Sequence, residues 1–181
     1  MNLIYGAHQR GYGFYHAPSQ NFMLAIPKNG TKSMRLITRS REAWREDNVF
    51  DLESVNRIIV LLRDPCARFL SALNMRIYTK NHNTFFINQL FDKCDLHFLE
   101  QYHYLYHIYD NYAEKVDFFY FNSNVFSEVN VYYNGIDLER MPRTNPSTKF
   151  ILSVAKTTVQ EMYSLDYDFM NTIEFKNRGS L

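Results

Sequence analysis

The segment that most constrains the fold of this 181-residue chain is an unbroken aliphatic run, Ile58–Leu62, set between two arginines. Such a run does not alternate with polar residues, which indicates a strand buried on both faces, as in the interior of a parallel sheet. Asp64 is suited to cap a following helix, and Pro65 to occupy its first turn. The sequence therefore predicts a strand that begins at Arg57 and that Pro65 ends, followed by a helix over about 66–79.

A second strand–helix unit precedes this one. Residues 22–26 form an apolar run that leads into a tight turn and then into hydroxyl-bearing and cationic residues. This is the pattern of a buried strand that passes through a turn into a helix. We expect the strand at 22–26 and the helix at 31–45, with Met34, Ile37 and Trp44 on the buried side of the helix.

The turn between that strand and that helix is a candidate anion site. The start of a helix presents unpaired backbone N–H groups at the positive end of the helix dipole, and both favour an anion. Side-chain donors gather at the same point, on Lys28, Thr31, Lys32 and Ser33. The sequence therefore predicts a phosphate-binding loop at residues 27–33.

The rest of the chain completes the single α/β domain that we expect, with a central, mainly parallel sheet flanked by helices. Residues 1–21 are expected to form an irregular lead-in. The further expected elements are helices at 84–92, 97–113, 123–129 and 147–163, strands at 116–121 and 131–133, and a loop at 142–146.

Composition excludes several classes of protein. The net charge of +1 does not favour a general nucleic-acid binder. No stretch approaches the ~20 apolar residues of a membrane span, and the first residues lack the apolar core of a signal peptide. We therefore expect a soluble, cytoplasmic protein. The two cysteines, Cys66 and Cys94, suggest neither a disulfide framework nor a metal cluster.

The loop at 27–33 differs from the Walker A pattern, G-x-x-x-x-G-K-[ST]. If Lys32 is taken as the motif lysine, Ile26 and Thr31 occupy the two glycine positions. The aliphatic run at 58–62 is also followed by Arg63 rather than by a carboxylate. A magnesium-dependent nucleotide triphosphatase is therefore disfavoured, and a P-loop kinase of small molecules or nucleotides is kept as an alternative.

Arg63 marks a second candidate anion site at the end of its strand. An arginine at the carboxyl end of a strand is suited to bidentate phosphate binding, and Ser71, eight residues on, adds a hydroxyl donor. Taken with the loop at 27–33, on an adjacent strand of the same sheet, this site predicts a ligand with two separated phosphate groups.

These segments resemble sulfotransferases. Residues 27–33 resemble their 5′-phosphosulfate loop, Pro-Lys-x-Gly-Thr-x-Ser, and residues 63–71 their 3′-phosphate motif, Arg-Asp-Pro-x-x-Arg-x-x-Ser. Residues 95–101 are similar to the Asp-x-His-x-x-x-Gln run of the Golgi-type carbohydrate branch, and residues 145–147 and 163–167 to its carboxyl-terminal pattern. The resemblance spans about residues 22–170.

The resemblance implies a P-loop-like three-layer fold that binds 3′-phosphoadenosine 5′-phosphosulfate as co-substrate, without a metal. It implies that the 3′ phosphate is bound by Arg63 and Ser71. The 5′ end would be bound by Lys28, Asn29, Gly30, Thr31, Lys32 and Ser33. The expected acceptor is a hydroxyl of a carbohydrate or glycan, and tyrosyl-protein or small-phenol acceptors stay open. A module that binds adenosine 3′,5′-bisphosphate without transfer is a further alternative.

Sulfuryl transfer requires two further functions. Negative charge builds on the leaving phosphate oxygen, and Lys28, at the turn, is expected to stabilise it. The acceptor hydroxyl must also lose a proton to a general base. The base in this family is a Glu or a His, and the candidates are His97, through the third motif, and Glu46 or Asp47, through their position after the first helix. His103 and His107 have helical spacing, but zinc is not expected there because no third ligand is evident.

Overall fold

The structure, a computed structural model, describes residues 12–47, 51–80, 97–138 and 156–178. In chain order its strands are β1 (Gly13–His16), β2 (Asn21–Leu24), β3 (Trp44–Asp47), β4 (Arg57–Leu62) and β5 (Val116–Tyr120). Its helices are α1 (Thr31–Ser40), α2 (Pro65–Lys80), α4 (Tyr102–Tyr112), α5 (Val125–Tyr132), α6 (Lys156–Met162) and α7 (Ser164–Thr172). Two short 3₁₀ helices are η1 (Leu52–Ser54) and η2 (Ala113–Lys115).

The strands form one mixed sheet in the order β3-β1-β2-β4-β5. β4 pairs in parallel with both of its neighbours, β2 and β5, while β1 pairs antiparallel with β2 and β3. The prediction of an interior parallel strand at the aliphatic run is thereby confirmed. The fold is α/β as expected, but the expectation of a mainly parallel sheet is wrong, because the sheet is parallel on one side and antiparallel on the other.

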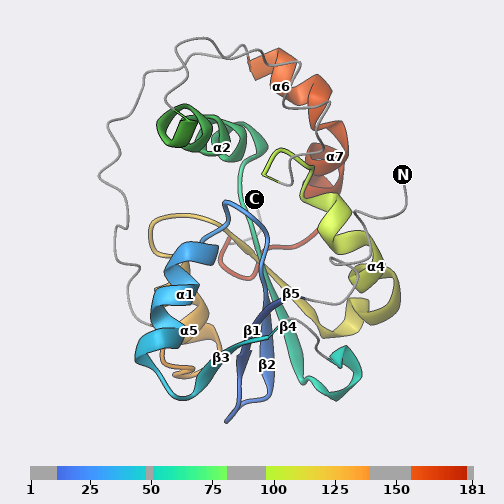
Figure 1. Ribbon diagram of the computed structural model, residues 1–181. Helices are drawn as coiled ribbons and strands as arrows, with labels where there is room; N and C mark the ends of the chain where they lie inside the picture. The colour runs from blue at the N-terminus through green and yellow to red at the C-terminus, as the bar shows by residue number, and fades with distance from the viewer. Residues whose placement is uncertain (1–11, 48–50, 81–96, 139–155, 179–181) are drawn as a thin grey trace.

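Helices cover both faces of this sheet (Figure 1). On β4, Ile59 and Leu61 belong to the core cluster that contains the buried residues of α1 and α5. Ile58, Val60 and Leu62 belong to a second cluster, with the buried residues of α4. Because successive side chains of a strand point to opposite faces, one aliphatic run supplies both cores.

A third core cluster lies beyond the end of the sheet. It joins Phe69 and Leu73 of α2 to Val159 of α6, to Tyr163, and to Phe98, which precedes α4. In Figure 1, α2 and α6 lie above the carboxyl ends of the parallel strands β2 and β4. The loop after β2 is bonded to α2, since Arg68 Nε donates to the Pro27 carbonyl at 3.0 Å, and β4 leads directly into α2. The helix at 66–79 is confirmed, and Asp64 Oδ1 accepts the Ala67 N–H at 2.8 Å as its cap.

The predicted carboxyl end of the first helix is wrong. The sequence predicts helix as far as residue 45, but α1 ends at Ser40, and Trp44 lies in β3. Trp44 is buried as expected. Its indole Nε1 donates to the Ile136 carbonyl at 3.1 Å. The centre of its ring lies 4.8 Å from the centre of the His16 ring on β1. Strand pairing and this packing override the helical pattern.

Other expectations also differ from the structure. β1 lies inside the lead-in that was expected to be irregular. Residues 131–133 were expected to be a strand, but Val131 and Tyr132 belong to α5. Of the helix expected at 147–163, residues 147–155 lie outside the described residues, and Lys156–Met162 form α6, which ends before Tyr163, after which α7 begins. The helix expected at 84–92 and the loop at 142–146 lie outside the described residues.

The segment after α7 pairs with the outer edge of β5. Phe175 forms a parallel bridge with Phe118, and the Lys176 N–H donates to the Phe118 carbonyl at 2.8 Å. The side-chain amide of Asn177 pairs with both main-chain groups of Tyr120, at 2.7 Å to the N–H and 2.9 Å to the carbonyl. Asn177 therefore takes the place of a neighbouring strand.

Candidate active site

The loop after β2 turns through two residues with positive φ. Lys28 has φ of 73° and Gly30 has φ of 87°. A lysine in this left-handed region is strained, and such strain is concentrated at functional sites. A Cβ added to Gly30 would lie 2.9 Å from Phe121 Cε2 and 3.2 Å from Phe126 Cζ. Glycine is therefore required at residue 30 by conformation and by space.

The loop leads into α1, and the first N–H groups of the helix, those of residues 31–33, make no intrahelical hydrogen bond. The first intrahelical bond of this end runs from the Met34 N–H to the Gly30 carbonyl at 3.0 Å. Gly30, at the cap position, has no side chain to bond the N–H groups of residues 31–33, and the first turn contains no acidic residue. The backbone thus has the form of an anion-binding helix start.

The side chains predicted to bind the anion differ in their burial and in their hydrogen-bond partners. The Thr31 hydroxyl donates to the Ile26 carbonyl at 2.9 Å, Lys32 is exposed, and Ser33 is buried. The Asn29 side chain is also buried, and its Nδ2 donates to the Leu61 carbonyl at 2.6 Å. Asn29 therefore fastens the loop to β4 through its Nδ2, while its Oδ1 is buried with no hydrogen-bond partner among the described residues.

Lys28 reaches α2. Its Nζ lies 3.0 Å from the Met75 Sδ. Ser71, which is half-buried, precedes Met75 by four residues and thus shares its face of α2. The helix that carries the predicted 3′-phosphate serine therefore contacts the lysine of the first loop.

Arg63 joins the two predicted anion sites directly. Its Nη1 donates to the Lys28 carbonyl at 3.2 Å, and its guanidinium lies 5.5 Å from the centre of the Phe121 ring. Burial lowers the pKa of Arg63, opposed by the charge of Asp64. An arginine keeps its charge despite such a shift, so the loop and the end of β4 share a half-buried cation.

Arg68 is fully buried, and the sequence analysis assigned it no function. Its Nε donates to the Pro27 carbonyl at 3.0 Å, and its Nη1 donates to the Leu99 carbonyl at 2.7 Å. Its Nη2 is buried with no hydrogen-bond partner among the described residues. Arg68 therefore clamps the loop to the segment before α4. The only sequence signal for it is the second arginine of the Arg-Asp-Pro-x-x-Arg pattern.

Gln101 is the second residue that sequence reasoning missed. Its side chain is buried, and it makes hydrogen bonds to Asn29, to both main-chain groups of Arg63, and to Asp166. Gln101 is the last residue of the segment that resembles the third sulfotransferase motif. His97, half-buried in the turn before α4, belongs to the same segment, which is bonded to the loop at Gln101 and to Arg68 of α2 at Leu99.

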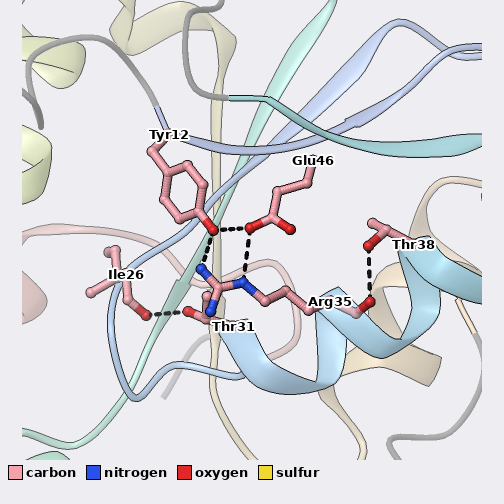
Figure 2. A network of polar contacts seen from close by, with 6 residues as sticks. All are labelled: Tyr12, Ile26, Thr31, Arg35, Thr38 and Glu46. Carbon is pink, nitrogen blue, oxygen red and sulfur yellow. Dashed lines mark hydrogen bonds and ion pairs between the residues drawn. The ribbon is translucent and has the colours of Figure 1, made fainter.

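Glu46 lies in a different network, beside α1 (Figure 2). Its Oε1 accepts the Nε–H of Arg35 at 2.8 Å and also the hydroxyl proton of Tyr12. Burial alone would raise the pKa of Glu46, but the hydrogen bonds from Tyr12 and Arg35 and the charge of Arg35 outweigh it and lower the pKa. Asp47 lies opposite Gly13 in the pairing of β3 with β1. The structure thus brings Lys28, Arg63, the helix that carries Ser71 and the His97 segment together, and holds Glu46 in an ion pair.

The two helical histidines have separate surroundings. His103 Nε2 lies 3.3 Å from Glu100 Oε2, and His107 is exposed, one turn further along α4. Within the described ranges, no three His, Cys, Asp or Glu side chains gather in a way that could hold a metal ion. In the same ranges, no helix has the length and apolar character needed to cross a membrane.

Comparison with protein-family models, with curated proteins and with solved structures finds no match.

Proposed function

We propose that this protein is a sulfotransferase that moves a sulfuryl group from 3′-phosphoadenosine 5′-phosphosulfate to an acceptor hydroxyl, on a P-loop-like three-layer domain. The contact of Arg63 Nη1 with the Lys28 carbonyl carries the proposal. It joins two cationic segments at the carboxyl ends of adjacent parallel strands, where ligands bind in open α/β sheets. A donor with anions at both its 5′ and 3′ ends matches such a paired site.

The roles follow from the local chemistry. The N–H groups of residues 31–33 and the Lys28 ammonium would bind the 5′ phosphosulfate, and Arg63 and Ser71 the 3′ phosphate. In the transfer, the acceptor oxygen forms a bond to sulfur while the bond from sulfur to the bridging phosphate oxygen breaks. Lys28 would stabilise the charge on that leaving oxygen. The products are a sulfate ester and adenosine 3′,5′-bisphosphate.

We propose His97, rather than Glu46, as the base that takes the acceptor proton. Histidine is the side chain most often used in this role. The segment of His97 is bonded to the donor loop directly by Gln101, and indirectly through Arg68, which donates to the carbonyls of both Leu99 and Pro27. Glu46 is committed to Arg35 and Tyr12, and its lowered pKa makes it a weaker base. A carbohydrate hydroxyl remains the proposed acceptor, on the strength of the resemblance alone.

A thermal-shift titration tests the donor site. A ligand that binds only the folded protein must raise its apparent stability. We expect a shift with adenosine 3′,5′-bisphosphate and none with ADP and Mg²⁺. A shift with ADP and Mg²⁺ alone would refute the proposal and favour the kinase.

A second assay separates the enzyme from a module that only binds the nucleotide. The wild-type chain is incubated with 3′-phosphoadenosine 5′-phosphosulfate and with glycan, phenol or tyrosyl-peptide acceptors. Formation of a sulfate ester on one acceptor class supports transfer and identifies that class. Nucleotide binding without ester formation from any class favours the binding module.

A further inference from the structure

We propose that Gln101 is a positioning residue that fixes the spacing between the 5′ and 3′ anion sites. This inference rests on the proposed function, but it concerns a residue that contributes no charge and no reacting atom. Its side chain lies between the two segments that would each hold one end of the donor.

The hydrogen bonds of Gln101 use the full capacity of its amide. Oε1 accepts from Asn29 Nδ2 at 2.5 Å and from the Arg63 N–H at 2.9 Å, and Nε2 donates to the Arg63 carbonyl at 2.8 Å and to Asp166 Oδ2 at 3.3 Å. A carboxamide has two acceptor lone pairs and two N–H donors, so all four are satisfied. Gln101 is 1% exposed, so water does not compete for these bonds.

The two partners define the function of this amide. Asn29 lies between the two residues of the loop with positive φ, Lys28 and Gly30. Arg63 is held by its main chain, immediately after β4. A bond to each from the same amide, together with the direct bond of Asn29 Nδ2 to the Leu61 carbonyl, fixes the distance between the loop and the end of β4, and with it the distance between the two anions that the site can accept.

Asp166 fixes the orientation of the amide. Its Oδ2 accepts from Gln101 Nε2, and its Oδ1 accepts the Tyr102 N–H at 2.8 Å, at the start of α4. A carboxylate can only accept at this point, so the nitrogen of Gln101 must face it and the oxygen must face Asn29. With the opposite orientation, Gln101 would present N–H groups to the Arg63 N–H and to Asn29 Nδ2.

The chain contains a matched control in Asn177. Its amide pairs with both main-chain groups of Tyr120, the last residue of β5, and Gln101 pairs in the same way with Arg63, just after β4. Asn177 also contacts Glu128 of α5, and it bonds neither the loop at 27–30 nor Arg63. Gln101→Met and Asn177→Leu therefore remove equivalent amides of similar shape, one between the two anion sites and one outside them.

The experiment compares three nucleotides by calorimetry. Adenosine 3′,5′-bisphosphate occupies both anion sites, whereas adenosine 3′-monophosphate and adenosine 5′-monophosphate each occupy one. We expect Gln101→Met to weaken the bisphosphate by about tenfold or more and each monophosphate by less than about threefold, equivalent to a difference above about 0.7 kcal/mol. Asn177→Leu should change all three by less than about threefold. Equal losses for the three nucleotides, or equal losses in the two variants, would overturn the proposal.

Hydrogen exchange provides a readout that needs no ligand. In Gln101→Met, the backbone amides of residues 28–33 should exchange about tenfold or more faster than in the wild type, and in Asn177→Leu they should not. Unchanged exchange in Gln101→Met would refute the positioning role. A wild-type protein that binds none of the nucleotides would instead refute the proposed function, while the exchange result would still decide whether Gln101 holds the loop.

Asp166→Asn serves as a milder second variant if Gln101→Met does not fold. It keeps the shape of the side chain and an oxygen for the Tyr102 N–H, but it turns an N–H group toward Gln101 Nε2. The same selective loss of bisphosphate affinity is expected, and its absence in a folded Asp166→Asn protein would count against the proposal.

Discussion

Phe121 lies against both halves of the candidate site: its ring centre is 5.5 Å from the Arg63 guanidinium carbon, and its edge fills the space beside Gly30. The ring supports the cation electrostatically and leaves no room for a side chain on the loop. The shape of the loop and the position of Arg63 therefore depend on the same aromatic residue.

Gly30→Ala should destabilise the protein by about 2–4 kcal/mol, because an alanine there adopts a left-handed conformation and contacts Phe121. Gly135→Ala is the control, since Gly135 has φ of 88° but nothing within 4 Å of an added Cβ. It should cost only the conformational part, about 1–2 kcal/mol. Urea unfolding measures both, and equal losses would show that Phe121 does not restrict residue 30.

Arg63→Ala should weaken adenosine 3′,5′-bisphosphate binding by about 1.5–3 kcal/mol, the range for a lost hydrogen bond to a charged group. Arg57→Ala removes an exposed arginine at the other end of the same strand, where it donates to the Glu114 carbonyl. It should leave the affinity within about twofold. Calorimetric titration measures both, and wild-type affinity in Arg63→Ala would remove Arg63 from the donor site.

Lys28→Ala should abolish sulfuryl transfer while adenosine 3′,5′-bisphosphate still binds, because Arg63 and Ser71 would still hold the 3′ phosphate. Lys32→Ala removes an exposed lysine from the same segment and should reduce turnover far less. The measurement is the transfer rate at saturating donor together with the dissociation constant. Comparable rates in the two variants would contradict the role assigned to Lys28.

His16 should make stability depend on pH. Its ring is buried against Trp44, its Nδ1 lies 2.7 Å from the Ser19 hydroxyl oxygen, and burial lowers its pKa, opposed by the charge of Asp137. The unfolded chain therefore binds more protons below about pH 6.5, and the free energy of unfolding should fall as the pH drops from 7 to 5. His16→Gln should flatten this dependence in urea unfolding at pH 5–8. Identical slopes would show that His16 does not cause it.

Local signals were sufficient for the parts of the fold that a single segment determines. The aliphatic run at 58–62 needs no partner to indicate burial on both faces, and Asp64 and Pro65 mark the start of α2 by their own chemistry. Trp44 is different, because its helical spacing was a real pattern that the pairing of β3 with β1 overrode. That pairing joins residues far apart in the chain, and no local feature predicts it.

The candidate site divides in the same way. Lys28, Gly30 and Arg63 were predicted because a turn with cations after a strand has a direct physical meaning. Arg68 and Gln101 were not assigned roles because their bonds go to backbone groups of Pro27, Leu99 and Arg63, which a sequence does not mark. Glu46 was proposed from its position in the chain, whereas its chemistry depends on Arg35 and Tyr12 (Figure 2).

The segment after α7 also protects one edge of the sheet from pairing with another molecule. By pairing with Phe118 and Tyr120, residues 175–177 occupy main-chain groups of β5 that would otherwise be open to strand addition. The opposite edge, β3, carries Arg45 and Glu46, and charged side chains discourage pairing with another strand. Loss of the residues beyond Thr172 would therefore open this edge of β5 to pairing and would also remove Phe175 from the core, so aggregation is expected.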